Sequence, residues 1–124
     1  MARTRVVYYR EGDGTVPVLE FLAAVPERAK VKIIARIGRL RELGHELRRP
    51  EADYLGDGIY ELRTALGHVK YRVLYFFHWN VAAVLSSGLA KEDKIPPVEL
   101  ERARQRMARF NQAPQAHTFE EQDT

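Results

Sequence analysis

The stretch IYELRTALGHVKYRVLYFFHWNVAAVLSSGL, residues 59–89, decides the fold. β-Branched and aromatic residues dominate it, and such residues are typical of strands. Short segments containing Gly, His, Trp or Asn divide it into three runs, at residues 59–64, 68–77 and 81–89. Connections of this length join antiparallel neighbours. The stretch therefore predicts a three-stranded antiparallel meander.

The middle run alternates between two kinds of side chain. One set is apolar or aromatic, and it comprises Val69, Tyr71, Val73, Tyr75 and Phe77. Successive side chains of a strand point to opposite faces, so His68, Lys70 and Arg72 share the other face. We expect the first face to be core and the second to lie in water.

Upstream of the meander, the sequence predicts one strand and two helices. Residues 3–9 have strand composition and end at a Glu-Gly-Asp-Gly turn. Thr15 is a candidate cap for a short first helix, and Pro26 suits the first position of a second. The second helix buries Val25, Ala29, Ile33, Ile37 and Leu40, and it presents a basic stripe of Arg28, Lys32, Arg36 and Arg39. Gly44 supplies its stop.

The remaining segments complete an α+β arrangement. Residues 45–58 are read as a polar connection, residues 97–110 as a third helix, and residues 112–124 as a mobile acidic tail. The expected order is β-α-α-β-β-β-α, with a small, mostly antiparallel sheet and the two N-terminal helices packed on one face. We expect residues 1–111 to form a single domain.

Composition restricts the class of protein. The chain has 124 residues, no cysteine and a net charge of +3, and no apolar run approaches the roughly 20 residues that span a bilayer. These features exclude a disulfide framework and a transmembrane protein. No signal-peptide segment follows Met1, so the cytoplasm is the expected location. Residues 27–49 contain eight Lys or Arg and three acids, and a basic field of this kind attracts polyanions.

Several kinds of catalytic site find no support in the sequence. The four histidines are scattered without metal-ligand spacing, so neither a metal nor another cofactor is expected. The Gly-x-Gly pairs at 12–14 and 56–58 lack the Gly-Lys-Ser/Thr of a phosphate loop. Ser86 and Ser87 lack the Gly-x-Ser-x-Gly elbow of a serine nucleophile.

Cations on the predicted sheet are the remaining candidates. Arg63 and Arg72 converge if their strands are neighbours, and Lys91 and Lys94 follow the last strand, at the rim of the same surface. Such a cluster can hold a scissile phosphate and stabilise the charge of an in-line attack by a ribose 2′-hydroxyl. The alternative is structural: Arg63 pairs with Glu61 or a helix acid, and Arg72 solubilises the sheet.

The sequence resembles the HigB-like, phage-protein-related branch of the RelE/ParE toxin superfamily of type II toxin–antitoxin systems, over most of residues 5–108. The residues that carry the resemblance are Pro17-Val-Leu-Glu-Phe-Leu22, Leu47-Arg-Arg-Pro-Glu51, Gly58-Ile-Tyr-Glu-Leu-Arg63, Tyr71-Arg-Val-Leu-Tyr-Phe76 and Pro96-Pro-Val-Glu-Leu-Glu-Arg-Ala103. The resemblance implies a RelE-like fold and a metal-independent endoribonuclease that cuts mRNA on the ribosome. It also implies a small antitoxin as partner, often with a helix-turn-helix.

The resemblance also assigns residues. The arginines of the Glu-Leu-Arg and Tyr-Arg motifs fall on Arg63 and Arg72, and Lys91 and Lys94 stand in the region where the family usually has His-Gly-Phe and a Lys-Lys pair. The candidates for RNA contact are His68, Lys70, Arg48 and Arg49. His68 and Tyr71 are reserve candidates for acid–base catalysis, although Tyr71 also shares the apolar face.

Two alternatives stay open at this point. The missing His and Lys-Lys segment suits a catalytically silent module that binds a partner through the same sheet, as relatives that poison gyrase do. The basic stripe of the second helix is a weaker candidate for direct DNA reading, because it lacks a helix-turn-helix arrangement. Whether the toxin cuts mRNA or only binds a partner, we expect acidic and apolar residues of the antitoxin to cover the basic stripe or the cationic sheet face.

Overall fold

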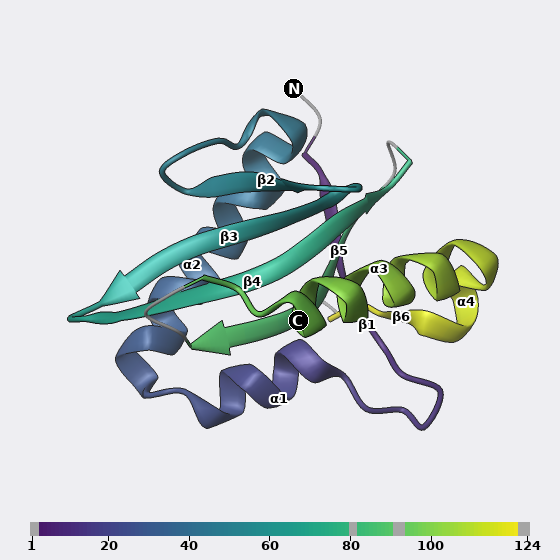
Figure 1. Ribbon diagram of the computed structural model, residues 1–124, viewed down its shortest axis with the longest axis horizontal. Helices are drawn as coiled ribbons and strands as arrows, with labels where there is room; N and C mark the ends of the chain where they lie inside the picture. Colours follow the sequence, from purple (N-terminus) through teal and green to yellow (C-terminus); the bar gives the residue numbers. More distant parts are fainter. Residues whose placement is uncertain (1–2, 80–81, 91–93, 122–124) are drawn as a thin grey trace.

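The structure is a computed structural model that describes residues 3–79, 82–90 and 94–121. A six-stranded sheet in the order β2-β3-β4-β5-β1-β6 forms its centre (Figure 1). The strands are β1 (Arg5–Tyr9), β2 (Ala52–Gly56), β3 (Ile59–Leu66), β4 (Val69–His78), β5 (Ala82–Ala90) and β6 (Thr118–Phe119). The helices are α1 (Pro17–Ala24), α2 (Glu27–Leu43), the 3₁₀ helix η1 (Gly44–Glu46), α3 (Pro97–Gln112) and α4 (Pro114–His117). β1 and β5 are parallel, and the other neighbours are antiparallel.

The meander predicted from residues 59–89 is confirmed. β3, β4 and β5 lie within two residues of the three predicted runs, and they pair in sequence order. A register shift between Leu74 and Tyr75 leaves Ser86 unpaired in β5, which is the geometry of a β-bulge. The bulge allows Leu85 and Ser87 to face opposite sides of the sheet.

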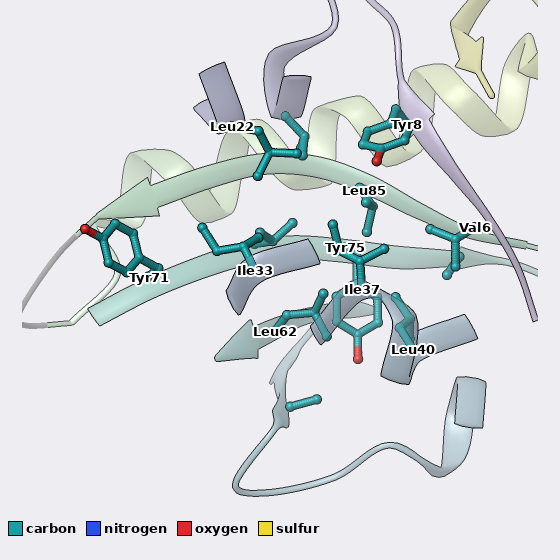
Figure 2. Close-up of a cluster of buried hydrophobic side chains, with 14 of the residues drawn as sticks. Val6, Tyr8, Leu22, Ile33, Ile37, Leu40, Leu62, Tyr71, Tyr75 and Leu85 are labelled. Carbon is teal, nitrogen blue, oxygen red and sulfur yellow. The ribbon is translucent and has the colours of Figure 1, made fainter. Parts of the chain in front are cut away.

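One face of the sheet carries the core that the second helix was predicted to build. Ile33, Ile37 and Leu40 of α2 are at most 1% exposed, and they pack over β3 and β4 (Figure 2). Leu22 of α1 joins the same cluster. Burying each such side chain contributes about 1.5–3 kcal/mol, so this face anchors both helices.

The opposite face is not in water as expected, because α3 packs against it. Leu74 and Phe76 of β4 are fully buried there, against Ala103 and Phe110 of α3. The side chain of Arg72, on the same face, is only 11% exposed. The helix at residues 97–110 was predicted, but its packing onto this face was not. The expectation that this face lies in water was therefore wrong.

The helix boundaries differ slightly from the expected ones. Val16, not Thr15, is the N-cap residue of α1, and Pro26 precedes the first residue of α2 instead of being that residue. Gly44 ends α2 as predicted, with φ of 53°, and a Cβ there would overlap the Thr4 side chain. Among the described residues, no helix is long and apolar enough to span a bilayer.

Residues 45–58 are more ordered than the expected polar connection. They contain the end of η1 and the edge strand β2, which pairs with β3 through Ala52 and Leu62. The observed order is therefore β1-α1-α2-β2-β3-β4-β5-α3-α4-β6, with η1 between α2 and β2. A five-residue edge strand has too few alternating positions to stand out in the sequence.

The segment expected to be an acidic tail adds a strand to the sheet. α4 leads into β6, which pairs with Tyr8 and Tyr9 of β1. Glu120 forms an ion pair of 2.7 Å with Arg5, and Glu121 accepts a 2.8 Å hydrogen bond from the Tyr8 hydroxyl. Glu120 and Glu121 therefore serve internal contacts, and β6 covers the outer edge of β1.

Candidate functional site

Arg63 and Arg72 occupy directly opposite positions on β3 and β4. Both line an open pocket of about 230 Å³ beside the free end of the β3–β4 hairpin. The pocket is lined by Arg36, Pro50, Arg63, Thr64, Ala65, Lys70, Tyr71 and Arg72. The predicted convergence of the two arginines is therefore present, and four of the lining side chains are cationic.

The carboxylate of Glu61 lies between these arginines. Its Oε1 is 3.1 Å from Nε of Arg72, and its Oε2 is 3.8 Å from Nε of Arg63. Two guanidinium groups at opposed positions repel each other, and a shared carboxylate reduces that repulsion. The Glu61 side chain is 7% exposed, so it acts as a buried counter-ion.

The two arginines differ in accessibility. The side chain of Arg63 is 33% exposed, whereas that of Arg72 is 11% exposed. Arg63 thus pairs loosely with Glu61, as in the structural alternative, but keeps a surface for a ligand. Arg72 does not solubilise the sheet, because most of its side chain is covered.

Glu51 fixes the segment at the edge of this pocket. Its carboxylate accepts hydrogen bonds of 2.9 Å from Arg36 and 2.9 and 3.1 Å from Arg39, and its carbonyl accepts a 2.8 Å bond from the Arg63 N–H. One residue therefore ties α2 to β3 at the position of Arg63. Two members of the basic stripe on α2 are engaged in this contact.

The other predicted residues are divided among several places. Lys70 lines the pocket, and His68 is exposed in the adjacent β3–β4 turn. Arg48 and Arg49 lie before β2 and line a different pocket. Lys94 is exposed beyond β5, and Lys91 lies outside the described residues.

Tyr71 lies in the core, as predicted from its place on the apolar face of its strand. It is 5% exposed and belongs to the cluster under α1 and α2, although its edge reaches the pocket lining. Burial of this kind leaves little access for proton transfer, which favours a packing role.

Sequence reasoning did not assign a site role to Glu61. A signal was present, because Glu61 is two residues from Ile59 and so shares a face with a side chain that is fully buried. The aromatic residues beside Arg48 were also missed, since Tyr54 lies in the strand that the sequence did not predict. Over residues 3–79, 82–90 and 94–121, no three His, Cys, Asp or Glu side chains gather into a possible metal site.

Glu61 and Glu51 are expected to give opposite pH dependences. Burial raises the pKa of the Glu61 carboxyl above its usual 4.5, and Arg72 and Arg63 oppose that shift. A raised pKa means that the folded state holds this proton more tightly than the unfolded state, so its contribution to stability falls as pH rises above 4.5. Hydrogen bonding to Arg39 lowers the pKa of Glu51, so its contribution is present at neutral pH and is lost on acidification.

Denaturant unfolding of Glu61→Gln and Glu51→Gln from acid to neutral pH measures this difference. We expect the stability gap between wild type and Glu61→Gln to move against the wild type as pH rises. The gap for Glu51→Gln serves as the matched control and should move in favour of the wild type. If the two gaps changed in the same direction as pH rises, the assignment of Glu61 as a buried carboxylate with a raised pKa would be contradicted.

Comparison with known proteins places this geometry in a family. Residues 20–108, which include both arginines and the whole β2–β5 meander, match the family model described as Phage derived protein Gp49-like (DUF891). No curated protein matches the chain. The matched family belongs to the RelE/HigB-like toxin family, and its members are generally toxin-like proteins of toxin–antitoxin systems. With more than half of its length matched, the chain belongs to the Gp49-like family of phage-derived proteins.

Proposed function

We propose that the protein is a HigB-like toxin of a type II toxin–antitoxin system that cuts mRNA on the ribosome. The observation that carries this proposal is the placement of Arg63 opposite Arg72 at an open, cationic pocket. The Gp49-like family supports the toxin part, and the chemistry of the pocket supports the ribonuclease part. The protein would act in the cytoplasm, where translation takes place.

The pocket suits cleavage by the RNA's own 2′-hydroxyl. In such a step the 2′-oxygen forms a bond to phosphorus, the bond from phosphorus to the 5′-oxygen breaks, and a cyclic phosphate remains. The 2′-hydroxyl gives up a proton, and the leaving 5′-oxygen takes one up. The transition state carries additional negative charge, and positioned cations stabilise it without the participation of a metal.

Each residue has a separate part in this proposal. Arg63, the more exposed arginine, binds the scissile phosphate, and Arg72 supports the same charge from a position held by Glu61. Lys70 holds a flanking phosphate at the pocket rim. His68, in the neighbouring turn, is the candidate for proton transfer, and Lys91 and Lys94 add positive field from beyond β5.

The proposed partners follow from the same activity. The ribosome and its mRNA supply the substrate, and a cognate antitoxin of helix-turn-helix type neutralises the protein. Two members of the basic stripe on α2 already bind Glu51, so the remaining stripe cations, Arg28 and Lys32, are accessible to an acidic antitoxin. Arg63 and Lys70 of the pocket add to them.

Expression in a bacterial host, with and without the adjacent small open reading frame, tests the proposal. Mapping mRNA ends on purified ribosomes should show cuts within the ribosomal A site, and coexpression of the antitoxin should abolish them. Intact mRNA together with unaffected growth would contradict the toxin assignment. Intact mRNA together with a DNA-damage response would support a gyrase-type binder and exclude the ribonuclease.

A further inference from the structure

We propose that a second pocket, beside β2, binds an unpaired RNA nucleobase together with its phosphate. This pocket has a volume of about 410 Å³. Its lining includes His45, Arg48, Tyr54 and Tyr60, as well as the ion pair of Arg49 with Asp53, so aromatic rings and an additional cation meet in one place. The inference rests on the proposed ribonuclease function and extends it to a site that recognises the substrate away from the cut.

The aromatic wall is continuous. The rings of Tyr54 and Tyr60 are 4.8 Å apart, those of Tyr60 and Phe77 are 5.2 Å apart, and His45 stacks on Phe77. Every nucleobase has a flat π-face, so an aromatic surface of this kind binds bases with little preference for sequence.

Tyr54 presents its ring to solvent in a fixed orientation. The residue is 54% exposed, although large aromatic side chains are usually buried, and its hydroxyl accepts a 2.9 Å hydrogen bond from the Gly58 N–H. The bond ties the far end of the ring to the β2–β3 turn. Stacking of a base on this ring therefore costs little side-chain entropy.

Arg48 is the cation that can bind the phosphate. The guanidinium of Arg49 is engaged by Asp53 at 2.7 Å, whereas the exposed Arg48 has no ion-pair partner among the residues that the structure describes. Nucleic-acid sites combine such a cation with stacking rings, and the phosphate contact makes binding sensitive to salt.

The pocket and the first one are lined by consecutive residues of the chain. Arg48 and Arg49 line the second pocket, Pro50 lines the first, and the Glu51 carbonyl accepts the Arg63 N–H. Two pockets lined by successive residues of one segment can hold neighbouring parts of one RNA strand. The backbone of residues 48–51 thus connects the stacking surface to the arginine pair.

Binding of a short single-stranded RNA, 2′-O-methylated throughout so that it cannot be cut, tests this site. Fluorescence anisotropy should show a loss of affinity of about ten- to a hundredfold for Tyr54→Ala, which corresponds to one lost base stack. Tyr54→Phe should bind within about twofold of wild type, because it keeps the ring and the edge strand. Arg48→Ala should reduce the slope of log affinity against log salt by about one. Arg102→Ala, an exposed arginine on α3 that lines neither pocket, serves as the matched control with a smaller change.

The outcomes separate this site from the proposed activity. Equal affinity of Tyr54→Ala and wild type, with an unchanged thermal midpoint, would overturn the site even if mRNA is cut. Dependence on Tyr54 in a protein that cuts no mRNA would keep the site and overturn the ribonuclease. Loss of binding by Tyr54→Ala to vacant ribosomes would assign the base to ribosomal RNA, and loss only on ribosomes that carry mRNA would assign it to the message.

Discussion

Replacement of Arg63 by alanine is expected to reduce mRNA cleavage about a hundredfold while the thermal midpoint stays almost unchanged. A charge-assisted contact made in the transition state is worth on the order of 3 kcal/mol. The side chain is one-third exposed, and its Nε pairs loosely with Glu61 at 3.8 Å, so its removal should cost the fold no more than about 0.5 kcal/mol. Arg63→Lys should restore little activity if the contact with phosphate is bidentate.

Arg72→Ala should behave differently, and the contrast is part of the prediction. Its loss leaves the buried Glu61 carboxylate without its closer partner, which is expected to lower the free energy of unfolding by about 1–3 kcal/mol in addition to the loss of cleavage. Both variants need melting and cleavage measurements on the same preparations, with Arg102→Ala, an exposed arginine outside both pockets, as a control. Full cleavage per folded molecule in Arg63→Ala and Arg72→Ala would remove these residues from the site.

The second large effect concerns Arg106, a buried cation on α3. It donates a 3.0 Å hydrogen bond to the Ser86 carbonyl at the bulge of β5, lies 3.3 Å from the Glu11 carboxylate and stacks over the Tyr9 ring at 5.5 Å. Alanine at this position leaves the carbonyl and the carboxylate without their donor and is expected to lower the free energy of unfolding by about 2–4 kcal/mol.

Arg102→Ala is the matched control for this measurement. It lies on the same helix, its side chain is 45% exposed and it pairs with Glu99 at 2.9 Å, so the expected loss is at most about 1 kcal/mol. Chemical denaturation of the two variants at neutral pH gives both values. Equal losses would show that Arg106 does not hold α3 to the sheet.

The sequence was most informative where one physical signal extended over many residues. The meander and α2 each repeat their periodicity over most of their length, and the structure confirms both. β2 and β6 were missed for the opposite reason. β6 has two residues, and its pairing with β1 depends on Tyr8, more than a hundred positions away, which no local pattern records.

The candidate site was predictable in its cations but not in their surroundings. Opposed strand positions follow from the length of the β3–β4 turn, so the pairing of Arg63 with Arg72 was accessible from the sequence. The burial of Arg72 depends on the position of α3 over the sheet, and the role of Glu61 depends on both arginines being present. Such tertiary effects decide that Arg63, and not the directly opposed Arg72, is the arginine more open to a ligand.

The parallel pairing of β1 with β5 has a consequence for the order of synthesis. Arg5 of β1 pairs with Ala82 of β5. β1 is synthesised first, but it cannot pair until β5 has also been synthesised. Sheets built from such distant pairs form slowly, because the chain between the two strands loses conformational entropy before the strand contacts compensate for that loss. The β3–β4 hairpin, which carries both arginines, is synthesised earlier, before β5 is present to pair with β4. A nascent chain that ends before residue 82 therefore contains both arginines but lacks β5, the strand that joins β2, β3 and β4 to β1.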